Sequence, residues 1–117
     1  MSNAKIARLL ELLIERTESG ELEWEPTVKS DVFQANFPRY SVRILTTEAE
    51  IDIDIVLQII NEEGLVVESV RDPQLNGFVE SAFLKMRALH ESARRIAMGV
   101  DKALDEIIDF LEPDIPF

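Results

Sequence analysis

Four carboxylates alternate along one short segment of the chain, at Glu48, Glu50, Asp52 and Asp54. Alternate residues of a β-strand share a face, so the segment predicts a row of carboxylates opposite the core. Calcium and magnesium need several oxygens that converge on one point, and a straight row with about 7 Å between neighbours does not converge. We therefore expect a solvated sheet face and no metal site. The alternative is a docking stripe for a basic partner.

His90 is the chain's single histidine, and histidine is the side chain that titrates most readily near neutral pH. General-base catalysis would also need a nucleophile and a carboxylate that orients the ring. The adjacent Glu91 does not serve, because on a helix it turns about a hundred degrees away. We expect His90 to lie at the boundary between core and solvent, and the sequence predicts no catalytic residue.

Four basic side chains surround this histidine in sequence and could clamp a phosphate or a carboxylate: Lys85, Arg87, Arg94 and Arg95. No glycine-rich loop accompanies them, so a nucleotide site has no support, and we expect no cofactor. We expect them to pair with Glu91 and with carboxylates of the N-terminal helix or of a partner.

The helix that must carry these residues has the clearest periodicity in the chain. Its apolar residues follow one stripe without a change of phase: Val79, Ala82, Phe83, Met86, Leu89, Ala93, Ile96, Ala97, Val100, Ala103, Leu104, Ile107, Ile108 and Leu111. The spacing predicts a long helix over residues 77–111, a rod of roughly 50 Å. A compact chain of 117 residues is only about 35 Å across. Either the rod bends at Gly99, or its far end packs on another molecule, most simply a second copy.

Charge is unevenly placed along this helix. Residues 80–98 hold four cations against two carboxylates, whereas residues 99–117 hold six carboxylates against Lys102. A basic half followed by an acidic half favours antiparallel docking between two copies, with Arg94, Arg95, Val100 and Ile107 as interface candidates. The alternative is a solvated face with local ion pairs, which contribute little to stability.

Composition limits the classes of partner. The chain has 117 residues, 46% of them hydrophobic, a formal net charge of -11 and no cysteine. Its negative field repels nucleic acid, and no apolar stretch is long enough to cross a membrane, so we expect neither as a partner. A secretion signal is not evident at the first residues, and we expect a cytoplasmic protein.

Two further segments complete the expected architecture. Residues 4–18 have the pattern of an amphipathic helix. After Trp24 and Pro26 the apolar period changes from 3.6 to 2, which predicts four antiparallel strands over residues 31–70. Turns are expected at residues 38–39, near 47–48 and at 61–64, where Gly64 suits a bulge with positive φ.

These turns predict one strand register. It pairs Phe33 with Ile44, Ala35 with Val42, Val42 with Ile53, Arg43 with Asp52, Ser41 with Asp54, Ile59 with Leu65 and Leu57 with Val67. One face of the sheet is then almost wholly apolar. The opposite face carries an apolar patch that we expect to be an interface: Leu45, Val56, Ile60, Val66 and Val70.

The predicted fold is α+β, a single two-layer domain over residues 1–117. A four-stranded antiparallel meander has the N-terminal helix and the long C-terminal helix on one face, in the order αββββα. This arrangement follows from the sheet width, since two helices of about 10 Å each fit side by side on four strands.

Four segments carry a resemblance: residues 22–25 (LEWE), 33–35 (FQA), 40–44 (YSVRI) and 93–105 (ARRIAMGVDKALD). Over residues 5–111 the chain loosely resembles a group of small bacterial proteins to which no activity is attached. The resemblance implies a bacterial origin and no catalytic residue. In size, acidity and mixed helix and sheet content the chain is also similar to the dimeric chaperones of type III secretion, although its uninterrupted meander departs from their pattern.

The sequence thus favours a non-enzymatic protein-interaction module that acts as a homodimer. The alternative is a secretion-chaperone-like protein that binds an extended client peptide in an apolar groove. An enzyme would have to rely on carboxylates or lysine, since the chain lacks cysteine and has one histidine.

Overall fold

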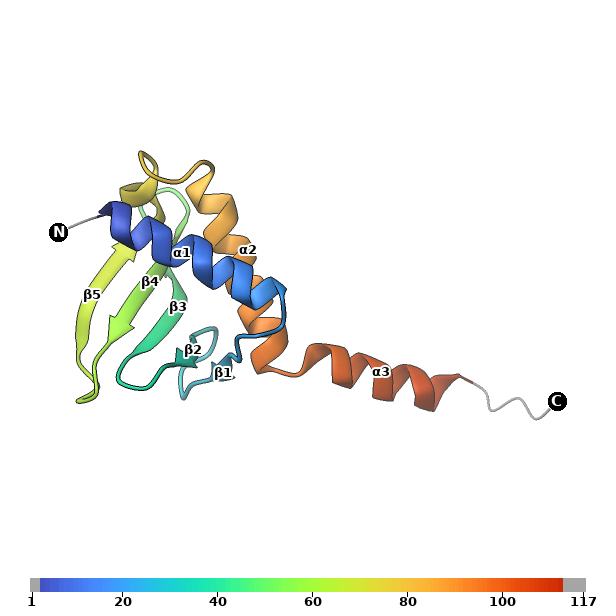
Figure 1. The fold of residues 1–117 in the computed structure, drawn as a ribbon. Helices are drawn as coiled ribbons and strands as arrows, with labels where there is room; N and C mark the ends of the chain where they lie inside the picture. Colours follow the sequence, from blue (N-terminus) through green and yellow to red (C-terminus); the bar gives the residue numbers. More distant parts are fainter. Residues whose placement is uncertain (1–2, 113–117) are drawn as a thin grey trace.

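The computed structural model describes residues 3–112 and is an α+β fold with an antiparallel sheet, as predicted. Within these residues five strands lie in the order β1-β2-β3-β4-β5 (Figure 1). The elements are α1 (Asn3–Glu18), β1 (Glu25–Pro26), β2 (Phe33–Asn36), β3 (Ser41–Glu48), β4 (Ile53–Ile60), β5 (Val66–Arg71), the 3-10 turn η1 (Asp72–Leu75), α2 (Ala82–Ala97) and α3 (Val100–Leu111).

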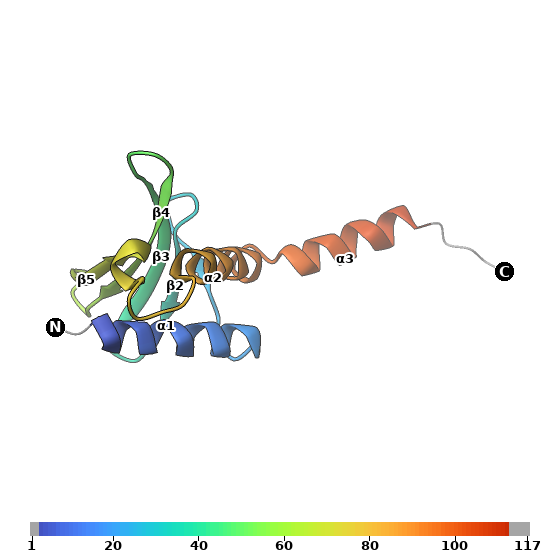
Figure 2. The ribbon, with the colours of Figure 1, turned by 90° about the horizontal axis from the view of Figure 1, so that it is seen from above.

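The core lies between one face of the sheet and the helices α1 and α2. A row of register partners crosses the sheet from Phe33 through Ile44 and Leu57 to Val70, and all four are buried. Leu10 of α1 and Met86 of α2 join the same cluster. Both helices therefore cover one face, which leaves the other face of the sheet turned away from them (Figures 1 and 2).

The expectation of four strands is wrong, because β1 adds a fifth. Glu25 pairs with Gln34 and Pro26 with Phe33. Two residues are too few to show an alternating pattern, so this strand reads in the sequence as part of a loop. Proline is tolerated there because β1 is an edge strand, where a missing N–H breaks no ladder.

The expected register is confirmed between β2 and β3 and wrong between β3 and β4. Val42 pairs with Ile59 instead of Ile53, and the turn lies at residues 49–52, where the Ala49 N–H donates to the Asp52 carbonyl over 2.7 Å. The register moves by an even number of residues, so most side chains keep their expected face. Ile51 does not, because it falls in the turn and is exposed.

Between β4 and β5 a bulge at Ile59 and Ile60 changes the parity of the pairing. The turn at residues 61–64 forms as predicted, with Gly64 at φ 83°. Val67 is the unpaired residue of this bulge and is 53% exposed, whereas Val70 beyond it is 2% exposed. The register expected from the sequence puts each on the opposite face, because it has no inserted residue to reverse the facing of those that follow.

The C-terminal helix is not one straight rod, and of the two possibilities that the sequence left open the structure has the bend. It breaks at Gly99, which has φ 62° and separates α2 from α3. The helix α3 then projects away from the remainder (Figures 1 and 2). The molecule measures 64 × 33 × 26 Å with a radius of gyration of 16.8 Å, whereas a compact chain of this length has about 13 Å.

Candidate interaction surface

The helix α3 is divided into an apolar and a charged side. At 3.6 residues per turn, one side carries the residues that we name the α3 face: Val100, Ala103, Leu104, Ile107, Ile108, Phe110 and Leu111. The other side carries Asp101, Lys102, Asp105, Glu106 and Asp109. Such a pattern is typical of a helix that packs against another surface.

Apart from Val100, which is half-buried at the joint with α2, the α3 face is exposed in the described part of the chain. None of residues 100–111 is buried by the rest of residues 3–112. Leu104 is 46% exposed, Ile107 57%, Leu111 71% and Phe110 87%. A continuous apolar face of this kind makes α3 the candidate interaction surface, since isolated exposed apolar residues are common but large clusters are not.

The joint between α2 and α3 sets the direction in which α3 projects. The Met98 N–H donates to the Arg94 carbonyl over 2.9 Å and the Gly99 N–H donates to the Ile96 carbonyl over 3.2 Å, which ends α2. The left-handed conformation of Gly99 is open to glycine at low cost. Across the joint, Arg95 Nη2 donates to Asp101 Oδ1 over 2.7 Å.

The candidates on the outer sheet face are largely withdrawn from solvent. Val70 lies in the core, and Val56 and Ile60 are 5% and 3% exposed between their cross-strand neighbours. Leu45 is half-buried, and Val66 is exposed. The structure therefore does not bring the five residues together as one exposed patch, whereas Val100 and Ile107 share the α3 face.

The acidic row is divided between two strands and a turn. Glu48 ends β3, Glu50 and Asp52 lie in the turn, and Asp54 is in β4, where its Oδ2 is 3.3 Å from Arg71 Nη1. The expected partners Arg43 and Asp52 do not meet, because Arg43 pairs with Gln58. Among the described residues, no group of three or more histidines and carboxylates is placed to hold a metal ion.

The contacts of His90 join two parts of the fold. Its Nε2 is 2.8 Å from the main-chain carbonyl of Asp31, and its ring centroid is 5.4 Å from that of Phe33. These contacts tie α2 to the loop before β2. A main-chain carbonyl and a phenyl ring are the partners of a side chain that helps to pack the fold, and neither is a nucleophile.

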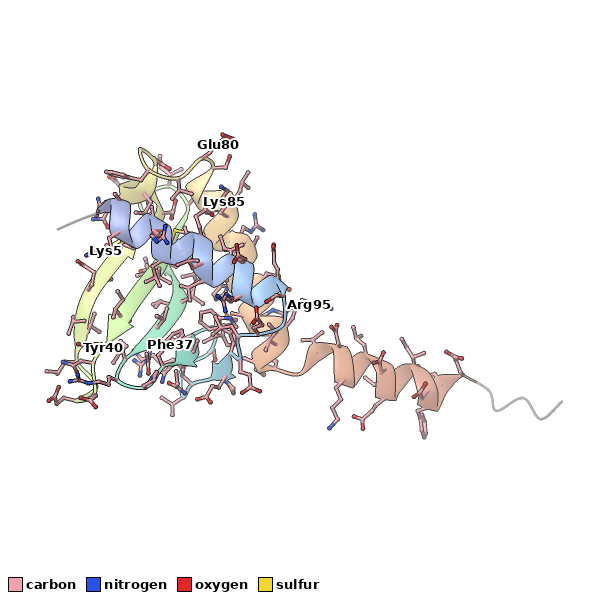
Figure 3. The ribbon with its side chains drawn as sticks, in the orientation of Figure 1. Lys5, Phe37, Tyr40, Glu80, Lys85 and Arg95 are labelled. Carbon is pink, nitrogen blue, oxygen red and sulfur yellow. The ribbon has the colours of Figure 1, made fainter. Side chains whose placement is uncertain are left out.

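Three of the basic side chains pair with carboxylates, two of them as expected. Lys85 Nζ is 3.3 Å from Glu11 Oε2 and joins α2 to α1 (Figure 3). Arg94 forms two hydrogen bonds with Glu91, the shorter 2.6 Å long. Hydrogen bonding to Arg94 holds the pKa of Glu91 below its ordinary value, and the same pair raises the pKa of Arg94. Arg95 instead bonds to Asp101.

Two hollows lie beside α2. One, of about 340 Å³, is lined by the loop before β2 and the end of α2, including Val28, Lys29, Arg94 and Met98. The other, of about 220 Å³, lies between α1 and α2, with Glu11, Glu18 and Lys85 at its edge. Both hollows are lined by polar as well as apolar side chains. In each, a cation is already paired with a carboxylate, Arg94 with Glu91 and Lys85 with Glu11.

Sequence reasoning assigned most of the α3 face to a continuous stripe and missed Phe110, which lies at the edge of the face. Its distance of three residues from Ile107 was the sequence signal that could have placed it on this face.

Comparison of the chain with protein-family models, with curated proteins and with solved structures finds no match. Within residues 3–112, every helix is too short or too polar to cross a membrane.

Proposed function

We propose that the protein is a non-enzymatic interaction module that acts as a homodimer through α3. The observation that carries this proposal is the exposed α3 face, in a helix that the rest of the described chain leaves uncovered. A second copy is the simplest partner because it supplies the same apolar face at the same concentration, and self-complementary contacts are the commonest in protein assemblies.

The low stability expected of an isolated α3 supports a role in binding. Helices shorter than about 12–15 residues are marginal in water, and α3 has 12. Burial of an apolar face supplies most of the stability of such helices in proteins. A partner would therefore stabilise the helix and bury its apolar residues in the same event.

The expected affinity is modest. Each copy brings five large, partly exposed side chains to the contact, and burying what remains exposed contributes roughly 1 kcal/mol for each. Loss of translational and rotational freedom offsets at least about 4 kcal/mol of that total. The ten side chains of two copies together contribute about 10 kcal/mol, so at most about 6 kcal/mol remains. Because about 8 kcal/mol corresponds to 1 μM and about 1.4 kcal/mol to a factor of ten, we expect a dissociation constant of tens of micromolar.

Sedimentation equilibrium tests the homodimer. The wild-type chain should sediment with twice the chain mass above the micromolar range, and Ile107→Asp should sediment as a monomer because it places a charge at the centre of the α3 face. Leu84→Asp is the matched control, since Leu84 is a 62% exposed apolar residue outside α3. A wild-type monomer at every concentration, or equal weakening by both variants, contradicts the proposal.

The alternative function, binding of an extended client peptide, has support from the sheet edge. The strand β5 is the last in the order and exposes Val66 and Val67. A peptide could pair with it as a further strand. Such binding would protect the β5 amides from exchange, whereas the homodimer would protect α3. The absence of cysteine agrees with either role in the cytoplasm.

A further inference from the structure

We infer that the two α3 helices pack antiparallel, with Val100 opposite Leu111 and Leu104 opposite Ile107 of the second copy. This inference rests on the proposed homodimer and adds the orientation and register of its contact. Each copy then presents the end of its α3 to the partner's joint between α2 and α3.

The spacing of the α3 face fits a paired helix. Val100, Leu104, Ile107 and Leu111 are separated by four, three and four residues, the alternation that places side chains on one seam between two helices. In the antiparallel register the twofold axis passes between Leu104 and Ile107, so every seam residue meets an apolar partner. Ala103 then lies near Phe110 of the second copy, a small residue beside a large one.

Charge selects the antiparallel orientation over the parallel one. Residues 105–112 carry four carboxylates and no cation. Residues 91–104 carry three cations and two carboxylates; Arg94 and Arg95 pair with these carboxylates, which leaves the segment a net charge of +1 from Lys102. A parallel pair would place the two acidic ends side by side. An antiparallel pair places each acidic end beside the partner's more basic joint, and it also aligns opposite ends of the helix dipoles.

The other apolar surfaces are poorer docking sites for α3. The hollow between α1 and α2 has Glu11 and Glu18 at its edge, and Lys85 there is already paired with Glu11. An acidic helix would meet carboxylates at that site. On the outer face of the sheet, Val56 and Ile60 are already buried.

Disulfide trapping tests the orientation directly, because the chain has no cysteine and each introduced thiol is unique. Val100→Cys and Leu111→Cys chains, one of them labelled with ¹⁵N, are oxidised separately and as a mixture, and the linked products are weighed. In the antiparallel pair, identical residues at these positions are separated by roughly 16 Å along the axis. A disulfide needs Cα atoms within about 7 Å, so we expect about tenfold more linked product from the mixture than from either variant alone.

Leu84→Cys gives the background from chance collisions, since this exposed position lies outside the α3 face. Each variant is also weighed by sedimentation in reductant. If either substitution dissociates the dimer, Ala103→Cys with Phe110→Cys takes its place, because these positions lie beside the same seam.

The outcomes separate this inference from the proposed function. A dimer that links Val100→Cys only to Leu111→Cys supports both. A dimer in which each variant links to itself overturns the antiparallel orientation alone and leaves the homodimer through α3 in place. A dimer with background linking places the contact outside α3 and overturns both the inference and the proposal that α3 forms the contact. A wild-type monomer overturns the homodimer and the inference with it.

Discussion

Two buried polar side chains fix how the helices and strands meet. Thr17 Oγ1 accepts a hydrogen bond of 3.0 Å from Trp24 Nε1, which ties the end of α1 to the segment before β1. Asp72 Oδ1 accepts one of 2.9 Å from the Ile55 N–H, which ties η1 to the beginning of β4. Buried polar groups without partners are costly, so these bonds favour this arrangement over others with similar apolar burial.

Asp72→Ala should lower the free energy of unfolding by about 1–3 kcal/mol, because it leaves the buried Ile55 N–H without an acceptor. Asp72→Asn is the matched control, since its carbonyl oxygen can still accept the bond. Urea denaturation followed by circular dichroism measures both. Equal losses for the two variants would show that the carboxylate acts through its charge rather than as an acceptor.

The sequence could not indicate this role for Asp72. Asp72 and Pro73 are typical of a loop, and the loop is where they lie. Only the folded chain brings Asp72 beside Ile55, seventeen residues away. The same is true of His90 and the Asp31 carbonyl, which are separated by fifty-nine residues.

The residue types in each turn decide which strand registers could be predicted from the sequence. The β2–β3 register was predictable because residues 38–39 leave room for only a tight turn, with the Phe37 N–H bonded to the Tyr40 carbonyl. The turn at 61–64 was predictable from Asn61, whose Oδ1 accepts two main-chain N–H groups, and from Gly64. Residues 49–52 contain no glycine, proline or asparagine, so their turn left no comparable signal.

The bulge between β4 and β5 gives the sharpest test at the level of an element. Val70→Ala should lower the free energy of unfolding by about 2 kcal/mol, because Val70 is buried in the core. Val67→Ala should change it by less than about 0.5 kcal/mol, because Val67 is exposed. Chemical denaturation of the two variants measures the difference. A larger loss for Val67→Ala than for Val70→Ala would contradict the bulge and support the register predicted without it.

The apolar stripe of residues 79–111 predicted the helices at residues 82–97 and 100–111, and it left open whether the helix bends at Gly99. Periodicity reports which residues share a face, and the stripe keeps its phase through the joint. It does not report the backbone conformation of a single residue. Gly99 has φ 62°, with nothing crowding this position, and this conformation ends the first helix. What the sequence did indicate is that the apolar residues extend beyond what the sheet can cover.

At the scale of the whole molecule, the structure is a packed two-layer body with an arm. The body buries its apolar residues against one face of the sheet, while α3 carries its apolar face beyond the body (Figure 1). Of the interface candidates from the sequence, Val100 and Ile107 lie on this arm, and Arg94 and Arg95 lie next to its joint. Among the sheet candidates, Val70 changes face because of the bulge, while Val56 and Ile60 keep the expected face but are buried.

Hydrogen exchange of the α3 amides, measured below and above the micromolar range, tests most directly whether a second copy covers the α3 face. Residues 100–111 should exchange rapidly in the dilute sample and become protected in the concentrated one, because pairing stabilises a helix that is marginal alone. Residues 82–97 of α2 should be protected equally in both samples, since the core holds them. Rapid exchange of α3 at every concentration, in a sample that sediments as a dimer, would contradict the account.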